Sequence, residues 1–80
     1  MSEFSINVRF FASLRERVGT GEKALLVDDR ATIADVWSLA VPDLALPDNL
    51  LVARNREYSS LEQRVAAGDE IAFFPPVTGG

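Results

Sequence analysis

The residues best suited to chemistry lie at the C-terminus, where the chain ends in Gly79-Gly80. A terminal carboxylate has an unperturbed pKa of roughly 3.5, so the carboxylate of Gly80 is ionised at neutral pH and is a poor electrophile. A partner that uses ATP would have to adenylate it, and sulfur transfer to the adenylate would leave a C-terminal thiocarboxylate. Neither glycine has a side chain that would block entry into a narrow active site. The sequence therefore predicts that Gly80 is the reactive position and that another protein activates it.

The segment before the glycines is suited to carrying them into a partner. Pro75-Pro76 cannot join a helix and favours a stiff, extended path, so less conformational freedom is lost on insertion. Val77 and Thr78 add β-branched stiffness before the flexible tip. Extended, the stretch from Pro75 to Gly80 spans about 20 Å. We expect residues 1–74 to form one domain and residues 75–80 (Pro75, Pro76, Val77, Thr78, Gly79 and Gly80) to form a flexible tail that inserts into another protein.

The composition excludes most other kinds of site. The 80 residues include no cysteine and no histidine, so a catalytic thiol, thiolate metal sites and the commonest general base are all excluded. The formal net charge is -4, and no basic cluster is typical of a phosphate-binding surface. No stretch has the pattern of a signal peptide or a membrane span. We expect a cytoplasmic protein that binds no cofactor, metal, nucleic acid or membrane.

The elements that must position the tail follow from the periodicity of apolar residues. Alternation and apolar runs predict strands at 4–10, 22–27, 50–54, 57–58 and 70–74. Helical spacing predicts a short helix within 11–18 and a main helix at 32–40. Thr32 and Asp35 match a capping box, and Pro42 ends the main helix. These elements predict an α+β fold of the β-grasp type, a mixed sheet curled around one helix, with the first and last strands adjacent at its centre.

Three aromatic residues are candidates for a partner-binding surface. Phe11 and Phe74 each follow a strand residue assigned to the core, so alternation turns them to the opposite face of the sheet, where Tyr58 can join them. An exposed apolar patch of this kind is typical of a docking surface, but the short helix or the loops can equally well cover it. Trp37 lies on the apolar stripe of the main helix and is interpreted as core.

The charged residues give no comparable signal. Isolated arginines are usually solvated, so we assign no site to Arg15, Arg17, Arg54, Arg56 and Arg64. Lys23 is the only lysine. It is a candidate target for an isopeptide bond, although a solvated strand lysine is the simpler interpretation.

Several segments together resemble a known family. They are Phe10-Phe11-Ala12, Arg15-Glu16, Val18-Gly19-Thr20 and, above all, the closing segment from Gly68 to Gly80. The chain resembles, over its whole length, the small subunits of molybdopterin synthase, which are ubiquitin-like sulfur carriers. The resemblance implies a β-grasp fold and adenylation of Gly80 by a ubiquitin-activating-like adenylyltransferase that uses ATP. Sulfur would then be installed on Gly80 as a thiocarboxylate.

The resemblance also implies partners and contacts. The tail would insert into a large synthase subunit, which holds the catalytic residues and builds the dithiolene of molybdopterin from cyclic pyranopterin monophosphate. Two small and two large subunits would form a heterotetramer, because a dithiolene needs two sulfur atoms. Phe11, Tyr58 and Phe74 would face the large subunit.

Three other functions remain open from the sequence. A β-grasp carrier with a diglycine end can also supply sulfur for the thiazole of thiamin or for another acceptor. A ubiquitin-like protein modifier would instead form isopeptide bonds through Gly80. A plain interaction module with an inert tail would do neither.

Overall fold

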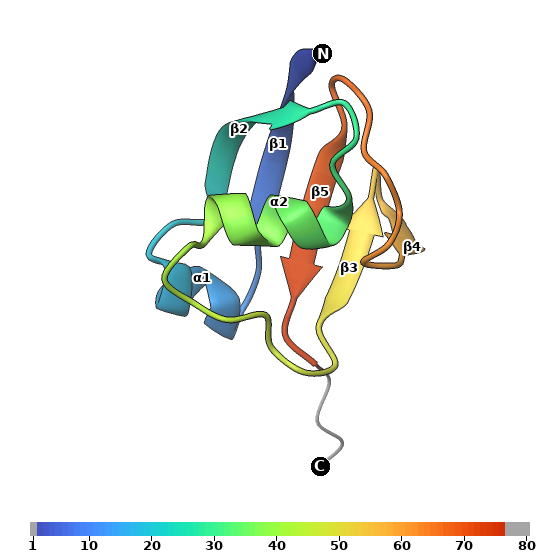
Figure 1. Ribbon diagram of the computed structural model, residues 1–80. Coiled ribbons are helices and arrows are strands. Elements are labelled where there is room, and N and C mark those ends of the chain that lie inside the picture. The colour runs from blue at the N-terminus through green and yellow to red at the C-terminus, as the bar shows by residue number, and fades with distance from the viewer. Residues whose placement is uncertain (1, 77–80) are drawn as a thin grey trace.

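A computed structural model describes residues 2–76, which form a mixed sheet with two helices. In chain order the elements are β1 (Glu3–Phe10), α1 (Ser13–Val18), β2 (Glu22–Asp28), α2 (Ile33–Ala40), β3 (Leu51–Arg54), β4 (Glu57–Ser59) and β5 (Glu70–Phe74). The strand order across the sheet is β2-β1-β5-β3-β4 (Figure 1). β1 and β5 are parallel neighbours, and the other neighbouring strands are antiparallel. The predicted α+β fold, with the first and last strands side by side, is confirmed.

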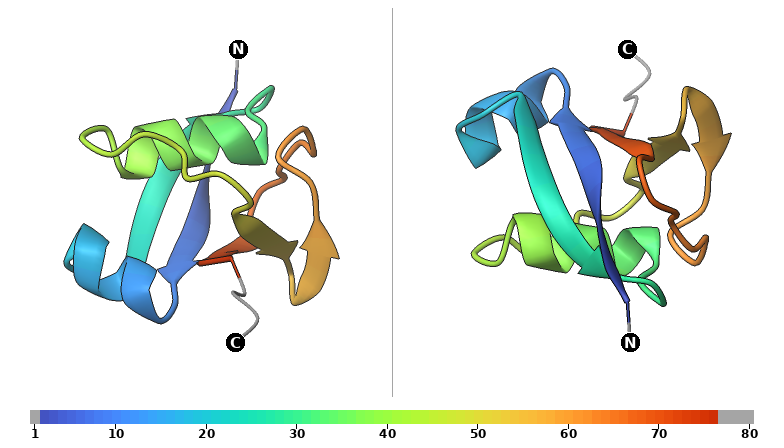
Figure 2. Two further views of the ribbon diagram at one scale, coloured as in Figure 1. Left: turned by 90° about the horizontal axis from the view of Figure 1, so that it is seen from below. Right: turned by 90° about the horizontal axis from the view of Figure 1, so that it is seen from above.

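The core lies between α2 and one face of the sheet, which curls around the helix (Figure 2). The alternation of β1 buries Ile6, Val8 and Phe10 beneath α2, as predicted. The Trp37 ring packs edge-on against the rings of Phe10 and Phe73, at centroid distances of 6.1 and 5.1 Å. Its indole nitrogen donates a hydrogen bond to the carbonyl oxygen of Leu44, so the polar end of this core residue is also satisfied.

Local signals set the ends of both helices. The hydroxyl of Thr32 accepts a hydrogen bond from the backbone amide of Asp35, and the Asp35 carboxylate accepts one from the amide of Thr32, which confirms the capping box. α2 ends at Ala40, before Pro42, as predicted. α1 ends at Val18 and is capped by Gly19, which has a φ of 94°, a left-handed conformation that glycine adopts without strain. Among residues 2–76, no helix is both long enough and apolar enough to cross a membrane.

Candidate functional site

The face of the sheet opposite α2, here called the outer face, carries a row of four paired residues. Arg9 on β1 is opposite Ala72 on β5, Ala72 is opposite Ala53 on β3, and Ala53 is opposite Tyr58 on β4. The two small alanines lie between the large side chains of Arg9 and Tyr58, so the surface is lower in the middle of the row than at its ends. A hollow of about 330 Å³ results. This outer-face hollow is lined by Arg9, Phe11, Ala53, Arg56, Tyr58, Glu70, Ala72 and Phe74.

The three aromatic residues predicted from the sequence all line this hollow. Phe11 and Phe74 are half-buried and their rings stack, with centroids 4.8 Å apart and 8° between the ring planes. The Phe11 amide donates a hydrogen bond to the carbonyl oxygen of Phe73, which holds the chain after β1 against the end of β5. Tyr58 is 81% exposed. The structure therefore brings these residues together, and their role in binding a partner stays a prediction.

A tight turn directs the chain away from the outer face immediately after Phe11. The amide of Leu14 donates a hydrogen bond to the carbonyl oxygen of Phe11, which closes the turn. Ala12 within this turn has a φ of 53° and a ψ of -132°, a conformation that costs a non-glycine residue of order 1–3 kcal/mol. The packing around the turn must offset that strain. Phe11 is thus fixed between a paired strand and a strained turn.

Among the charged residues of the hollow, Glu70 and Arg56 lie away from the stacked rings, and Arg9 lies along one side. One carboxylate oxygen of Glu70 lies 3.4 Å from Nη1 of Arg9, and the other lies 3.8 Å from Nε of Arg56. The Arg9 guanidinium also lies over the Phe11 ring, 5.5 Å from its centroid, in a cation–π arrangement. Glu70 and Arg56 therefore make one end of the hollow charged, and Arg9 contacts both that end and the aromatic one.

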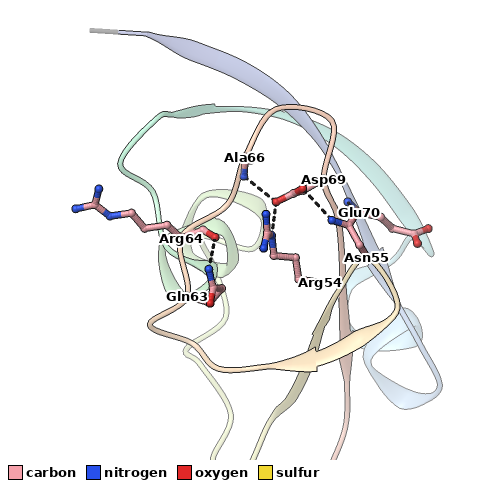
Figure 3. Close-up of polar contacts among 7 residues, drawn as sticks. All are labelled: Arg54, Asn55, Gln63, Arg64, Ala66, Asp69 and Glu70. Carbon is pink, nitrogen blue, oxygen red and sulfur yellow. Dashed lines mark hydrogen bonds and ion pairs between the residues drawn. The ribbon is translucent and has the colours of Figure 1, made fainter.

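A buried carboxylate supports the hairpin that carries Arg56. Asp69 is 5% exposed and accepts hydrogen bonds from Nε of Arg54 at 2.6 Å, Nδ2 of Asn55 at 3.0 Å and the amide of Ala66 at 2.7 Å (Figure 3). Burial alone raises the pKa of Asp69, but these donors outweigh it and hold the pKa below the usual 3.8. Asp69 is therefore a charged anchor for the turn between β3 and β4.

The turn itself adopts a conformation that its sequence does not favour. Asn55 and Arg56 have φ values of 52° and 71°, which identify the two-residue type of hairpin turn predicted from the sequence. Asn55 also exchanges two hydrogen bonds with Glu70, through its amide and its side-chain oxygen. These contacts hold Arg56 in a left-handed conformation beside the hollow, where glycine would be the usual residue.

The tail begins at the aromatic end of the hollow. β5 ends at Phe74, and the half-buried Pro75 and Pro76 follow it. Because β1 and β5 are parallel, the chain leaves β5 at the end of the sheet where α1 lies (Figure 1). The predictions for Val77, Thr78, Gly79 and Gly80 fall outside the described residues.

Sequence reasoning missed several members of the site and misjudged two arginines, one of which, Arg56, lines the hollow. Arg9, Glu70, Ala53 and Ala72 were not singled out, although alternation along β1 and β5 places the first two on the outer face. Arg54 is not simply solvated, because it pairs with the buried Asp69. Lys23 donates a hydrogen bond of 2.8 Å from Nζ to the carbonyl oxygen of Ala40, at the C-terminal end of α2. This contact gives the single lysine a structural role.

A model of the ThiS family matches residues 8–80. The chain belongs to the ThiS family. Two curated relatives are molybdopterin synthase sulfur carrier subunits. The subunit of Haemophilus influenzae is 45% identical, and the match covers 94% of this chain and 99% of that protein. The subunit of Escherichia coli is 40% identical, and the match again covers 94% of this chain and 99% of that protein. The resemblance inferred from the sequence is thereby confirmed.

A solved structure that is similar to this ThiS family member confirms the predicted β-grasp fold. The crystal structure of small archaeal modifier protein 1 from Haloferax volcanii superposes with a TM-score of 0.79 and is 35% identical, covering 92% of this chain and 99% of that one. That protein is named as a modifier, whereas the two curated relatives are named as sulfur carriers. Both functions are compatible with the same fold.

Proposed function

We propose that this chain is the sulfur carrier subunit of a molybdopterin synthase and that Gly80 bears the sulfur as a C-terminal thiocarboxylate. The observation that carries this proposal is the similarity, over 94% of the chain, to sulfur carrier subunits from Haemophilus influenzae and Escherichia coli. The terminal Gly79-Gly80 supports it, since neither of the last two residues has a side chain.

The chemistry begins with activation by a partner. A ubiquitin-activating-like adenylyltransferase uses ATP to convert the Gly80 carboxylate into an acyl adenylate, with pyrophosphate as the leaving group. A sulfur nucleophile then displaces AMP and leaves the thiocarboxylate. This chain supplies no side chain to either step. It presents its terminal carboxylate in a form slim enough to enter the partner's active site.

The second half of the reaction takes place on another partner. The tail from Pro75 to Gly80 inserts into a large synthase subunit, whose residues catalyse dithiolene formation on cyclic pyranopterin monophosphate. One tail delivers one sulfur atom, so a heterotetramer of two small and two large subunits provides the two atoms that a dithiolene needs. The carrier is a sulfur donor and not an enzyme by itself, and it acts in the cytoplasm.

The outer-face hollow is the surface that docks on the large subunit. Phe11 and Phe74 form its aromatic end, and Tyr58 stands exposed on its far wall. Pro75 follows Phe74 directly, so a partner seated in the hollow lies at the base of the tail. Docking there would give the tail one direction of entry, which supports a joint role for the three aromatic residues.

The test is sulfur transfer in a purified system. The Gly80 thiocarboxylate is prepared chemically and mixed with a molybdopterin synthase large subunit and cyclic pyranopterin monophosphate, and the dithiolene product is assayed. We expect product from the full chain and none from a variant that lacks Gly80. Product from the shortened variant, or none from the full chain with a large subunit shown to be active with another carrier, would refute the proposal.

A second candidate is protein modification through Gly80. The similarity to small archaeal modifier protein 1, at 35% identity and a TM-score of 0.79, is the observation that favours it. Intact-mass analysis of cell proteins after activation of Gly80 would reveal isopeptide conjugates, and their absence would count against this function. A sulfur carrier for thiamin remains a further alternative, which binding to a thiazole synthase in place of the large subunit would support.

A further inference from the structure

The outer-face hollow carries excess positive charge in a protein that is acidic overall. Arg9 and Arg56 both line it, against the single carboxylate of Glu70. The formal charge of this group is therefore positive, whereas that of the whole chain is -4. A charge opposite to that of the rest of the molecule, gathered in one hollow, favours a partner group of negative charge.

The two arginines are only loosely held within the chain. Their distances to Glu70 are 3.4 and 3.8 Å, compared with 2.6 Å between Arg54 and Asp69. Charge-assisted hydrogen bonds are usually about 2.7–2.9 Å long, so neither contact in the hollow is a strong one. The Arg9 and Arg56 side chains are 43% and 87% exposed, although Nε of Arg9 is itself buried and, within residues 2–76, has no hydrogen-bond partner. Both guanidinium groups therefore retain donors for a further carboxylate.

The rest of the hollow is apolar, which restricts the occupant further. Ala53 and Ala72 form the floor, between Tyr58 and the stacked pair of Phe11 and Phe74. A free phosphate would satisfy the arginines but would leave the exposed Tyr58 side chain and the half-buried rings of Phe11 and Phe74 without an apolar partner. A protein surface with an apolar group beside a carboxylate would satisfy both ends.

We propose that the hollow binds an acidic side chain of the large subunit together with an adjoining apolar side chain. The carboxylate pairs with Arg56 and Arg9, and the apolar side chain lies on Ala53 and Ala72. This inference rests on the proposed function, which identifies the partner. Two contacts of different chemistry, at separate places in one hollow, also fix the orientation of the carrier and hence the direction in which its tail points.

The experiment compares two charge reversals that change the net charge equally. Arg56→Glu acts inside the hollow, and Arg64→Glu acts at an exposed arginine outside it, whose side chain points away from Asp69 (Figure 3). Binding of each full-length variant to the large subunit is measured by calorimetry at low and high salt. We expect Arg56→Glu to raise Kd about tenfold and to flatten its salt dependence, and Arg64→Glu to change Kd less than about twofold.

A second variant and a kinetic readout separate docking from chemistry. Arg9→Gln removes the other charge and should also weaken binding. In the thiocarboxylate assay, both hollow variants should raise KM and leave kcat unchanged, because Gly80 is intact.

Equal weakening of binding by Arg56→Glu and Arg64→Glu, or no weakening by Arg56→Glu, would overturn the inference. Product from the wild-type chain would still uphold the proposed function in that case. Saturable binding of inorganic phosphate or ATP to the chain alone, lost in Arg56→Glu, would also overturn the inference, because the hollow would then be an anion site.

Discussion

The rings of Phe11 and Phe74 stack nearly parallel at 4.8 Å, and this contact joins the end of the first strand to the last residue before the two prolines. The stack places an aromatic surface beside the start of the tail. Phe74 ends β5 and Phe11 directly follows β1, the parallel neighbour of β5, so each ring depends on the pairing of these two strands for its position.

Phe11→Ala is expected to impair docking more than folding. The stacking contact contributes about 1 kcal/mol to stability, because Phe11 is only half-buried and lies outside the main core. At the centre of an interface, loss of an aromatic anchor costs about 2 kcal/mol or more, or roughly a thirtyfold rise in Kd. Urea denaturation and calorimetry with the large subunit measure the two effects. Leu26→Ala is the control, since Leu26 is 63% exposed but does not line the hollow; equal weakening by both variants would contradict the assignment.

Ala53→Leu is expected to block the hollow without disturbing the fold. Ala53 is only 6% exposed but lines the hollow of about 330 Å³, so the added side chain can extend into that space and overpacking should cost no more than about 1 kcal/mol. The partner would lose that space, and Kd should rise at least about tenfold. Ala24→Leu, at an exposed position on β2, supplies the same change of residue outside the hollow. Unchanged affinity for Ala53→Leu would show that nothing docks there.

Asp69→Asn is expected to destabilise the protein by about 2–4 kcal/mol at neutral pH, because it leaves the Arg54 guanidinium without its buried partner. The wild-type contribution also depends on pH. Since the folded-state pKa of Asp69 is below 3.8, the stabilisation is present above that value and is lost as pH falls through the folded pKa. Urea denaturation at pH 7 and at successively lower pH should therefore show a smaller acid-induced loss in the variant. Parallel pH profiles for the two proteins would contradict this role.

Lys23→Met is expected to lower the free energy of unfolding by about 0.5–1 kcal/mol. The change removes a cation from the C-terminal end of α2 and leaves the carbonyl oxygen of Ala40 without its side-chain donor. Lys23→Arg should restore most of the stability, because it keeps the charge. Denaturation of both variants at low and high salt gives the comparison, and equal stability of Met and Arg at this position would refute the capping role.

Much of the fold was predictable because its local signals agree with one another. The limits of β5 were predicted from Gly68-Asp69 and the apolar run that follows, and those of α2 from Thr32 and Pro42. The hairpin turn at Asn55-Arg56 was also predicted. Its stability could not be, because the hydrogen bonds that hold it come from Asp69 and Glu70, which lie far along the chain.

The site was less accessible to sequence reasoning for a similar physical reason. Alternation indicated that Phe11 and Phe74 share a face, but the register between strands decides which residues meet. Arg9 reaches Glu70 only because β1 pairs with β5 in parallel, and the hollow exists only because Ala72 and Ala53 are opposite each other. Whether the hollow and the tail act on the same partner stays a prediction.

The parallel pairing of β1 and β5 has a mechanical consequence. A force that pulls the C-terminal tail away from the start of β1 would act along the two strands, so their hydrogen bonds would be loaded in shear and together. Antiparallel neighbours pulled at a hairpin would instead separate one bond at a time. An enzyme that unfolds proteins by pulling on this tail should therefore meet strong mechanical resistance. A carrier held by its terminal glycine should keep its docking surface folded under the applied force.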